Sequence, residues 1–337
     1  MDIGKLSQEH MMGLFSIGLG AHRRDVVVGP ALGLDCAVLK VSDEVYAVVK
    51  SDPITFASER IGWYAVQVNA NDVATTGADP AWFLSTLLLP PTVEEGMVRE
   101  VFSQIHRAAK EMGVAVVGGH TEVTPAVEQV LVSATMIGFI KPSELIMGED
   151  VSPGDLILMT KGAAIEATAI IAQDKGDEVS RMLGQEKQRE GAAFLDRPGI
   201  SVLKEARLLR DGGAVKAMHD VTEGGVRAAI YELAKACELG LEFYEASVPI
   251  DPLTFELCGC FDLDPLACIS SGSLLAALAE EDADAAIEAL RGEGIEARVV
   301  GKFLSKDRGF STIDGQGGQR RAMTYQPRDG IGKLFQD

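Results

Sequence analysis

The stretch Gly62–Pro80 reads G-W-Y-A-V-Q-V-N-A-N-D-V-A-T-T-G-A-D-P, and it decides how the surrounding chain folds. Its apolar residues recur at near-helical spacing, which predicts a mostly buried helix of about four turns. Gly77 stands where a left-handed C-terminal cap belongs. Pro80 prevents the helix from continuing.

Three polar residues, Asn69, Asn71 and Asp72, are set into this apolar helix. Burying such groups costs free energy unless a partner satisfies them. Asn69 and Asp72 are three residues apart, so they share a face of the helix, whereas helical geometry does not aim Asn71 at the same place. The helix therefore predicts a partner for the Asp72 carboxylate.

Composition and length describe a soluble two-domain protein. The chain has 337 residues, of which 47% are hydrophobic and 24% charged. The polar, turn-rich stretch 148–155 predicts a boundary, which gives domains 1–150 and 151–337. Strands and helices alternate in the first half, so we expect an α/β (α+β) fold.

The net charge and the length of the apolar runs argue against nucleic acid and membranes as partners. A net charge of -19 repels nucleic acid and anionic lipid surfaces, and a polyanionic substrate would need metal ions. No apolar run reaches the roughly 18 to 20 residues that a membrane span requires. The N-terminal residues lack the pattern of a secretory signal, so we expect a cytoplasmic protein.

The chain has five cysteines, an odd number that does not indicate a disulfide framework. Cys258 and Cys260 form C-G-C and Cys268 follows, but no matching His or second Cys pair completes a zinc site. They are either buried thiols or part of a redox or sulfur-handling site.

Four carboxylates stand at strand ends or in motif-like loops: Asp35, Asp52, Asp72 and Asp220. Each alone is explained by a cap or a turn. Four that converge could not all be ionised without cations, because neighbouring like charges raise one another's pKa. Magnesium bound to carboxylates and substrate phosphates resolves this, so the set favours a metal-phosphate site.

Two glycine-bearing motifs suit an anionic ligand. Gly118-Gly119-His120-Thr121-Glu122 follows the apolar run 114–117, which predicts a buried strand with the motif at its C-terminal end. His219-Asp220-Val221-Thr222-Glu223-Gly224-Gly225 precedes a predicted helix, whose N-terminus would attract an anion. Either motif could be only a tight turn or a packed strand end. The chain has no P-loop and no G-x-G-x-x-G after its first strand.

In order along the chain stand G-L-D-C-A-V-L (33–39), K-S-D-P (50–53), V-N-A-N-D-V-A-T-T-G-A-D-P (68–80), G-G-H-T-E (118–122) and H-D-V-T-E-G-G (219–225). This ordered set resembles the aminoimidazole ribonucleotide (AIR) synthetase-like, or PurM-like, superfamily over nearly the whole chain. The resemblance implies an N-terminal α/β domain that dimerises through its strands, a C-terminal α/β domain, and bound Mg-ATP.

The resemblance also implies roles for single residues. Asp35, Asp52, Asp72 and Asp220 match the metal-binding aspartates. The expected nucleotide-binding residues are Gly33, Ser51, Asn69, Asn71, Gly118, Gly119, His120 and Thr121. The motifs identify no catalytic residue.

H-D-V-T-E-G-G and I-S-S-G-S-L-L (269–275) are most similar to the HypE-like hydrogenase maturation proteins. Two departures stand out. The chain ends G-K-L-F-Q-D, where HypE carries a C-terminal cysteine for a carbamoyl group. His120 replaces the acidic residue expected after G-G.

We therefore expect a Mg-ATP-dependent enzyme that phosphorylates an oxygen of a small or protein-borne substrate. One alternative is a kinase for a thiamine-like phosphate ester. Another is a non-catalytic ATP-binding partner in metalloenzyme maturation. The expected assembly is a homodimer, with a maturation protein as a further partner.

Overall fold

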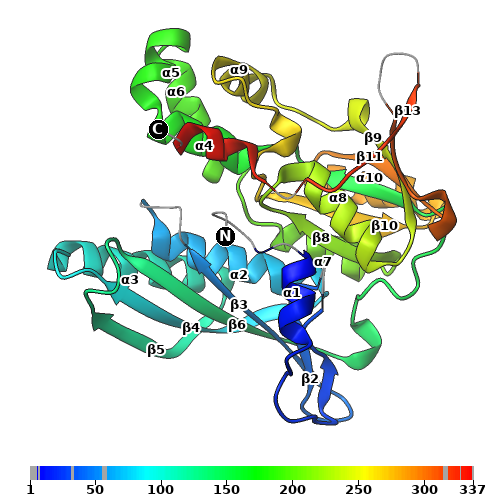
Figure 1. The fold of residues 1–337 in the computed structure, drawn as a ribbon, viewed down its shortest axis with the longest axis horizontal. Helices are drawn as coiled ribbons and strands as arrows, with labels where there is room; N and C mark the ends of the chain where they lie inside the picture. The colour runs from blue at the N-terminus through cyan, green and yellow to red at the C-terminus, as the bar shows by residue number, and fades with distance from the viewer. Residues whose placement is uncertain are drawn as a thin grey trace. The chain divides into compact units, whose positions relative to one another are not determined.

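The computed structural model describes residues 6, 8–31, 34–54, 59–313, 318–326 and 328–335. Its contacts divide the chain into two compact units, both visible in Figure 1. The N-terminal unit is Gly20–Leu145, and the C-terminal unit is Ile146–Asp337 together with Met1–Leu19. Each unit is built on one mixed sheet with helices, so the predicted α/β (α+β) class is confirmed.

The sheet of the N-terminal unit has the strand order β1-β2-β3-β6-β4-β5. All neighbours in it are antiparallel except β4 and β5. The strands are β1 (Val26–Val28), β2 (Ala37–Lys40), β3 (Tyr46–Ile54), β4 (Asp79–Leu89), β5 (Ala115–Val123) and β6 (Leu131–Ile140).

Helix α2 (Ile61–Thr75) is the predicted buried helix, and it packs on β3, β6 and β4. Gly138 of β6 allows this close approach, since a Cβ there would lie 2.5 Å from Cγ1 of Val73. Gly77 has the expected positive φ of 84°. The apolar run Ser85–Leu89 predicts only a short strand, whereas β4 already contains Pro80 and is therefore longer.

Helix α3 (Glu95–Met112) covers α2, and the side chain of Gln104 accepts a hydrogen bond from the Gly62 N–H at 3.0 Å. The amphipathic run from Thr92 to about Met112 predicts a helix that starts at Thr92 and ends at Gly113, and the φ of 74° at Gly113 confirms that end. The predicted start at Thr92 is wrong, because Glu94 is the N-cap and Thr92 lies in the preceding turn.

The prediction for β5 is wrong in two respects. The apolar run 114–117 was expected to be a buried strand with G-G-H-T-E beyond its end. The motif instead continues the strand, and all nine residues of β5 are exposed in the single chain. The physical reason is position, because β5 is an edge strand that pairs only with β4.

The C-terminal unit has a sheet in the order β13-β12-β9-β11-β7-β10-β8. Its strands are β7 (Leu156–Thr160), β8 (Val215–Val221), β9 (Gly240–Tyr244), β10 (Ser273–Leu278), β11 (Ala297–Leu304), β12 (Phe310–Ile313) and β13 (Arg320–Ala322). Its helices are α1 (Gln8–Phe15), α4 (Ile165–Asp174), α5 (Gly176–Leu183), α6 (Gln185–Ala192), α7 (Leu203–Asp211), α8 (Gly225–Ala236), α9 (Pro252–Cys260) and α10 (Ala283–Gly292).

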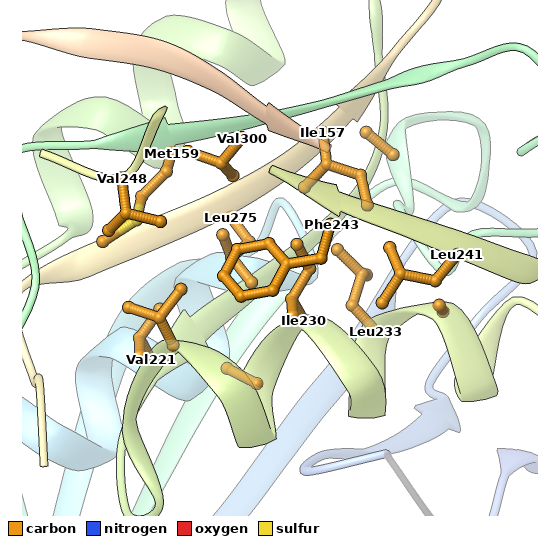
Figure 2. Packing of buried hydrophobic residues seen from close by; sticks show 14 of the residues in the cluster. Ile157, Met159, Val221, Ile230, Leu233, Leu241, Phe243, Val248, Leu275 and Val300 are labelled. Atoms are coloured by element: carbon orange, nitrogen blue, oxygen red, sulfur yellow. The ribbon is translucent and has the colours of Figure 1, made fainter. Parts of the chain in front are cut away.

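The core of this unit lies between α8 and the sheet. Figure 2 shows Phe243 at its centre, with Ile230 and Leu233 of α8 beneath it and Ile157 and Leu275 of the sheet around it. All five side chains are buried. Burying a large aliphatic or aromatic side chain contributes about 1.5–3 kcal/mol, so this cluster fixes the position of α8 and of the loop that leads into it.

The charged, glycine-containing stretch 174–199 predicts a mobile loop with one short helix. The structure has two helices there, α5 and α6, joined at Gly184. Val179 is buried and anchors α5, which the low average hydrophobicity of the stretch concealed. Across the described part of the chain, no helix combines the length and apolar character that crossing a membrane requires.

Candidate functional site

Three of the four predicted metal-binding aspartates surround one lysine in the N-terminal unit. The Lys50 Nζ atom lies 3.2 Å from Oδ2 of Asp72, 3.6 Å from Oδ1 of Asp35 and 3.9 Å from Oδ2 of Asp52. We call these four residues the aspartate–lysine cluster. Its existence supports the grouping of Asp35, Asp52 and Asp72 that their positions in the sequence suggested.

Strand geometry explains how the cluster forms. Lys50 and Asp52 are two residues apart on β3, so their side chains lie on the same face of the sheet. Helix α2 packs against β3 and carries Asp72. Asp35 stands just before β2, which is the neighbour of β3 in the sheet. Residues far apart in sequence thus meet at one point.

The backbone of Asp72 is held in place from two sides. The Cys36 thiol donates a hydrogen bond to the Asp72 carbonyl oxygen at 3.3 Å. The Thr75 hydroxyl donates to the same oxygen at 2.7 Å. Cys36 directly follows Asp35, so the loop before β2 is tied to the helix that carries Asp72.

Burial differs across the cluster. The side chain of Asp72 is 5% exposed and that of Lys50 is 12% exposed, whereas those of Asp35 and Asp52 are more than a third exposed. Burial lowers the pKa of Lys50, whereas the carboxylates of Asp72, Asp35 and Asp52 raise it. Their combined effect is larger than that of burial, so the pKa of Lys50 lies above its ordinary value. The cluster therefore has a closed, charge-compensated side and an open acidic side.

The donor set of this cluster fits a magnesium ion. Carboxylate oxygens are the ligands that Mg²⁺ takes from proteins, and it keeps waters and phosphate oxygens as its other ligands. Asp35 and Asp52 are open to solvent and could bind such an ion. Lys50 was missed as a member of the site, although K-S-D-P places it on the same face as Asp52.

The asparagines of α2 are both fully buried. The Asn69 side-chain amide donates to the Ala65 carbonyl oxygen at 2.9 Å, one helical turn earlier. Its Oδ1 atom has no hydrogen-bond partner among the described residues. Asn69 Oδ1 is therefore a buried acceptor, which suits a ligand that donates a hydrogen bond.

Ser51 does not face the cluster. It stands between Lys50 and Asp52 on β3, so its side chain lies on the opposite face of the sheet. There its hydroxyl donates to the Ala134 carbonyl oxygen at 3.1 Å and accepts from Thr135 at 3.2 Å. Gly33, another predicted nucleotide-binding residue, lies outside the described residues.

The G-G-H-T motif lies on the same row of the sheet as the cluster. Asp52 pairs with Ala134, Ala134 with Ser85, and Ser85 with Gly119. Gly119 has φ 148°, and a Cβ there would lie 1.9 Å from the Ser85 carbonyl oxygen, so only glycine fits. Strand packing therefore accounts for Gly119 without any ligand.

The other residues of the motif alternate between the two faces of β5. His120 and Glu122 share one face, with Nε2 of the imidazole 3.1 Å from a carboxylate oxygen. Thr121 lies on the other face, and Gly118 pairs with Leu84. All of them are exposed, so they form an open surface along the edge of the sheet.

Asp220, the fourth predicted metal-binding aspartate, belongs to the C-terminal unit. It lies near the end of β8, pairs with Leu274 of β10 and is buried. The neighbouring His219 places Nε2 3.4 Å from an oxygen of Glu232 on α8. The strand end thus carries a buried acid beside a histidine.

The N-terminus of α8 already holds an anion from the chain itself. Asp329 accepts a hydrogen bond from the Gly224 N–H at 2.7 Å and another from the Ile331 N–H at 2.9 Å. Burial raises the pKa of Asp329, while the N–H groups of Ile331, Gly224 and Ile269 oppose that shift. The helix N-terminus does attract a negative charge, as its sequence suggested, and that charge is Asp329.

A buried acid, Glu166, stands in the first turn of α4. Burial raises the pKa of Glu166 to about 7, a hydrogen bond from Ser271 opposes the rise, and the charges of Glu223 and Asp329 add to it. Its Oε2 atom has no hydrogen-bond partner among the described residues. Sequence reasoning missed this residue because nothing in I-E-A-T distinguishes it from a surface glutamate.

The cysteines of the C-terminal unit are free thiols. A hydrogen bond with Cys258 and burial raise the pKa of Cys268. Burial also raises the pKa of Cys237, to about 11, and that of Cys260. The raised pKa keeps the thiols of Cys237, Cys260 and Cys268 protonated at neutral pH, so they do not have the character of thiolate nucleophiles.

Comparison with known proteins agrees with the motifs. The model of the AIR synthase related protein N-terminal domain matches residues 33–140, and that of the C-terminal domain matches residues 152–314. A carbamoyl dehydratase HypE of Rhodobacter capsulatus is 30% identical over 283 residues, which cover 83% of this chain and 79% of that relative.

Two solved structures have the same fold. One is a crystal structure of the hydrogenase maturation protein HypE in complex with ATP, whose sequence is 25% identical to this chain. The two structures superpose with a TM-score of 0.71, and the match covers 90% of this chain and 92% of the HypE chain. Thiamine monophosphate kinase from Aquifex aeolicus is 16% identical, with a TM-score of 0.68 over 94% of this chain and 100% of that one, which shows the fold alone. The chain therefore belongs to the AIR synthase-related, PurM-like family, in which it is similar to the HypE hydrogenase maturation proteins.

Proposed function

We propose that this protein is a Mg-ATP-dependent enzyme that transfers the γ-phosphoryl group of ATP to an oxygen of its substrate and so activates that oxygen. The observation that carries the proposal is the aspartate–lysine cluster, in which three carboxylates and one ammonium meet on one side of the sheet. The similarity to HypE, of which one structure holds ATP, supports it.

Asp35, Asp52 and Asp72 would hold the magnesium ion, and Asp220 is the fourth proposed ligand. The ion, when bound, would neutralise the phosphate charge that grows during transfer. Phosphoryl transfer requires the protein mainly to position the reactants and to stabilise negative charge. It needs no nucleophilic side chain, which agrees with motifs that identify no catalytic residue. Lys50 contributes a further positive charge.

The nucleotide would use groups from α2 and β5. Asn69 offers a buried acceptor, which suits an N–H or O–H donor of the ligand. Gly118, Gly119, His120 and Thr121 lie on the exposed edge strand. Asn71, Ser51 and Gly33 remain proposed contacts by family resemblance.

The names of the relatives suggest the class of acceptor. Dehydration of a carbamoyl group removes its oxygen and two N–H protons. Transfer of the γ-phosphoryl group to that oxygen would release ADP, and the oxygen would then leave as inorganic phosphate while the nitrogen loses both protons. We propose an acceptor oxygen of this kind, carried by a small molecule or by a partner protein in metalloenzyme maturation.

The exposed edge strand supports the proposed homodimer. Val116, Val117 and Val123 of β5 are between 48% and 61% exposed. An exposed edge strand that carries apolar side chains is a template for pairing with another chain. A second copy covering β5 would remove this surface from water.

The test is phosphate release from ATP, measured with a panel of amide, carbamoyl and thiamine monophosphate acceptors. We expect an acceptor of the amide class to stimulate release in Mg²⁺. Asp52→Asn and Asp72→Asn should abolish the stimulated rate, whereas Asp43→Asn, an exposed aspartate of the same unit, should not change it. Stimulation only by thiamine monophosphate would indicate the kinase instead. ATP binding without turnover on any acceptor would indicate a non-catalytic partner.

A further inference from the structure

The contacts of Lys50 differ from those of a structural ion pair. Its Nζ atom lies between 3.2 and 3.9 Å from three carboxylates. Lys216 of the C-terminal unit instead lies 2.8 and 2.9 Å from the two oxygens of the single carboxylate of Asp155. Lys216 is paired, whereas Lys50 is a cation shared among several oxygens.

The position of Lys50 is one that suits a metal ion. Several carboxylates from different elements face it, and its side chain is only 12% exposed. Its ammonium compensates one of the three carboxylate charges, and a single divalent ion would compensate the other two. Because the ammonium and a metal ion repel each other, they compete for the same oxygens.

We propose that Lys50 is the resident counter-ion of the aspartate site and that it makes metal binding there depend on nucleotide. The inference rests on the proposed Mg-ATP function and adds a regulation to it. Without nucleotide, the ammonium holds the carboxylates and a divalent ion binds weakly. The phosphates of a nucleotide bring negative charge that attracts both cations and gives the ammonium a second partner.

The physical consequence is that a divalent ion enters the aspartate site only together with a nucleotide. A metal ion that arrives alone must displace the ammonium from Asp72, which is 5% exposed and therefore poorly screened by water. When the metal ion arrives with the phosphates, the ammonium can move to a phosphate oxygen, so that Asp72 becomes available to the ion. The site would thus stay free of divalent ions until a nucleotide binds.

The experiment measures Mn²⁺ binding to the full chain without nucleotide, by the electron paramagnetic resonance signal of the free ion. The variants are Lys50→Met, Lys50→Arg and the control Lys40→Met, a lysine on the neighbouring strand that pairs with exposed Asp43. We expect Lys50→Met to bind Mn²⁺ at least about tenfold more tightly than the wild type, because the competing charge is gone. Lys50→Arg and Lys40→Met should bind as weakly as the wild type.

Two results would overturn the inference. One is equal Mn²⁺ affinity of Lys50→Met and the wild type, and the other is a wild type that binds Mn²⁺ as tightly without ATP as with it. The wild-type measurement needs no variant to fold. If Lys50→Met is unstable in a chelator, the inference requires that Mn²⁺ raise its unfolding temperature more than that of the wild type, and a failure to do so counts against it.

The same samples separate this inference from the proposed function. A wild type that binds neither ATP nor Mn²⁺-ATP contradicts the proposed function. A wild type that binds Mn²⁺-ATP, together with an unchanged Lys50→Met, leaves the proposed function standing and removes the role of Lys50.

Discussion

In each of the two units, a charged side chain of the protein occupies the position at which the sequence predicts a charged ligand, and the two side chains have opposite charges. In the N-terminal unit, Lys50 lies among the aspartates where the sequence predicts a metal ion. In the C-terminal unit, Asp329 lies at the N-terminus of α8 where the sequence predicts an anion. In both places the chain itself supplies the charge that the motif alone would assign to a ligand.

The difference between them lies in how the charge is held. Asp329 makes short hydrogen bonds of 2.7 and 2.9 Å to backbone N–H groups. Lys50 makes ionic contacts no shorter than 3.2 Å, spread over three partners. Directional hydrogen bonds fix a group, whereas shared ionic contacts are easier to exchange for another charge. We therefore regard Asp329 as structural and Lys50 as exchangeable.

The largest effect should follow removal of the exchangeable charge. Lys50→Met leaves Asp72 buried without its counter-ion, which should lower the free energy of unfolding in a chelator by about 3 kcal/mol. The measurement is denaturant unfolding followed by tryptophan fluorescence, because both tryptophans, Trp63 and Trp82, lie in the N-terminal unit. An unchanged midpoint would mean that water already compensates Asp72.

A pH dependence should come next in size and should concern the C-terminal unit. The folded-state pKa of Glu166, about 7, lies above its ordinary value of 4.5. The folded state therefore keeps the proton longer, and the free energy of unfolding should fall as pH rises from about 4.5 to 7, by up to about 3 kcal/mol.

Glu166→Gln tests this pH dependence. The variant should flatten the fall between pH 4.5 and pH 7, because the amide does not titrate. Circular dichroism of denaturant unfolding at each pH measures it, with Glu178→Gln on α5 as the control. A variant with the same slope as the wild type would show that Glu166 does not cause the dependence.

A smaller effect is expected when the structural anion is changed. Asp329→Asn keeps one carbonyl acceptor for the backbone N–H groups but removes the charge at the helix N-terminus. We expect a loss of about 1 kcal/mol in the free energy of unfolding. Hydrogen exchange at Gly224 and Ile331 locates the loss, and unchanged protection of both amides would refute the structural role of Asp329.

The smallest effect is expected at Lys40. Its ion pair with Asp43 is exposed to water. Lys40→Gln should leave the tryptophan-monitored unfolding midpoint unchanged within error. A midpoint shift as large as that of Lys50→Met would erase the distinction between a shared buried cation and a surface pair.

Local patterns in the sequence predicted much of the fold. The apolar spacing within Gly62–Pro80 predicted α2, and Gly77 and Gly113 predicted the ends of α2 and α3. The motif order predicted the family. These features depend on neighbouring residues, so a single sequence contains them.

The unpredicted features depend on tertiary placement. The exposure of β5 depends on which strands lie beside it, and Asp329 is 105 residues away from the Gly224 N–H that it binds. Lys50 was visible in K-S-D-P, but its role depends on Asp35 and Asp72 meeting it from other elements. Motifs identified the acids, and the packing of α2 on β3 identified their counter-ion.

Calorimetric titration of ATP into the wild-type chain, once with Mg²⁺ and once with a chelator, tests the central claim most directly. The account predicts clear binding with Mg²⁺ and at least about tenfold weaker binding in the chelator, because the phosphates then meet the aspartates without a metal ion. Equal affinity under the two conditions would contradict a metal-dependent nucleotide site at Asp35, Asp52 and Asp72.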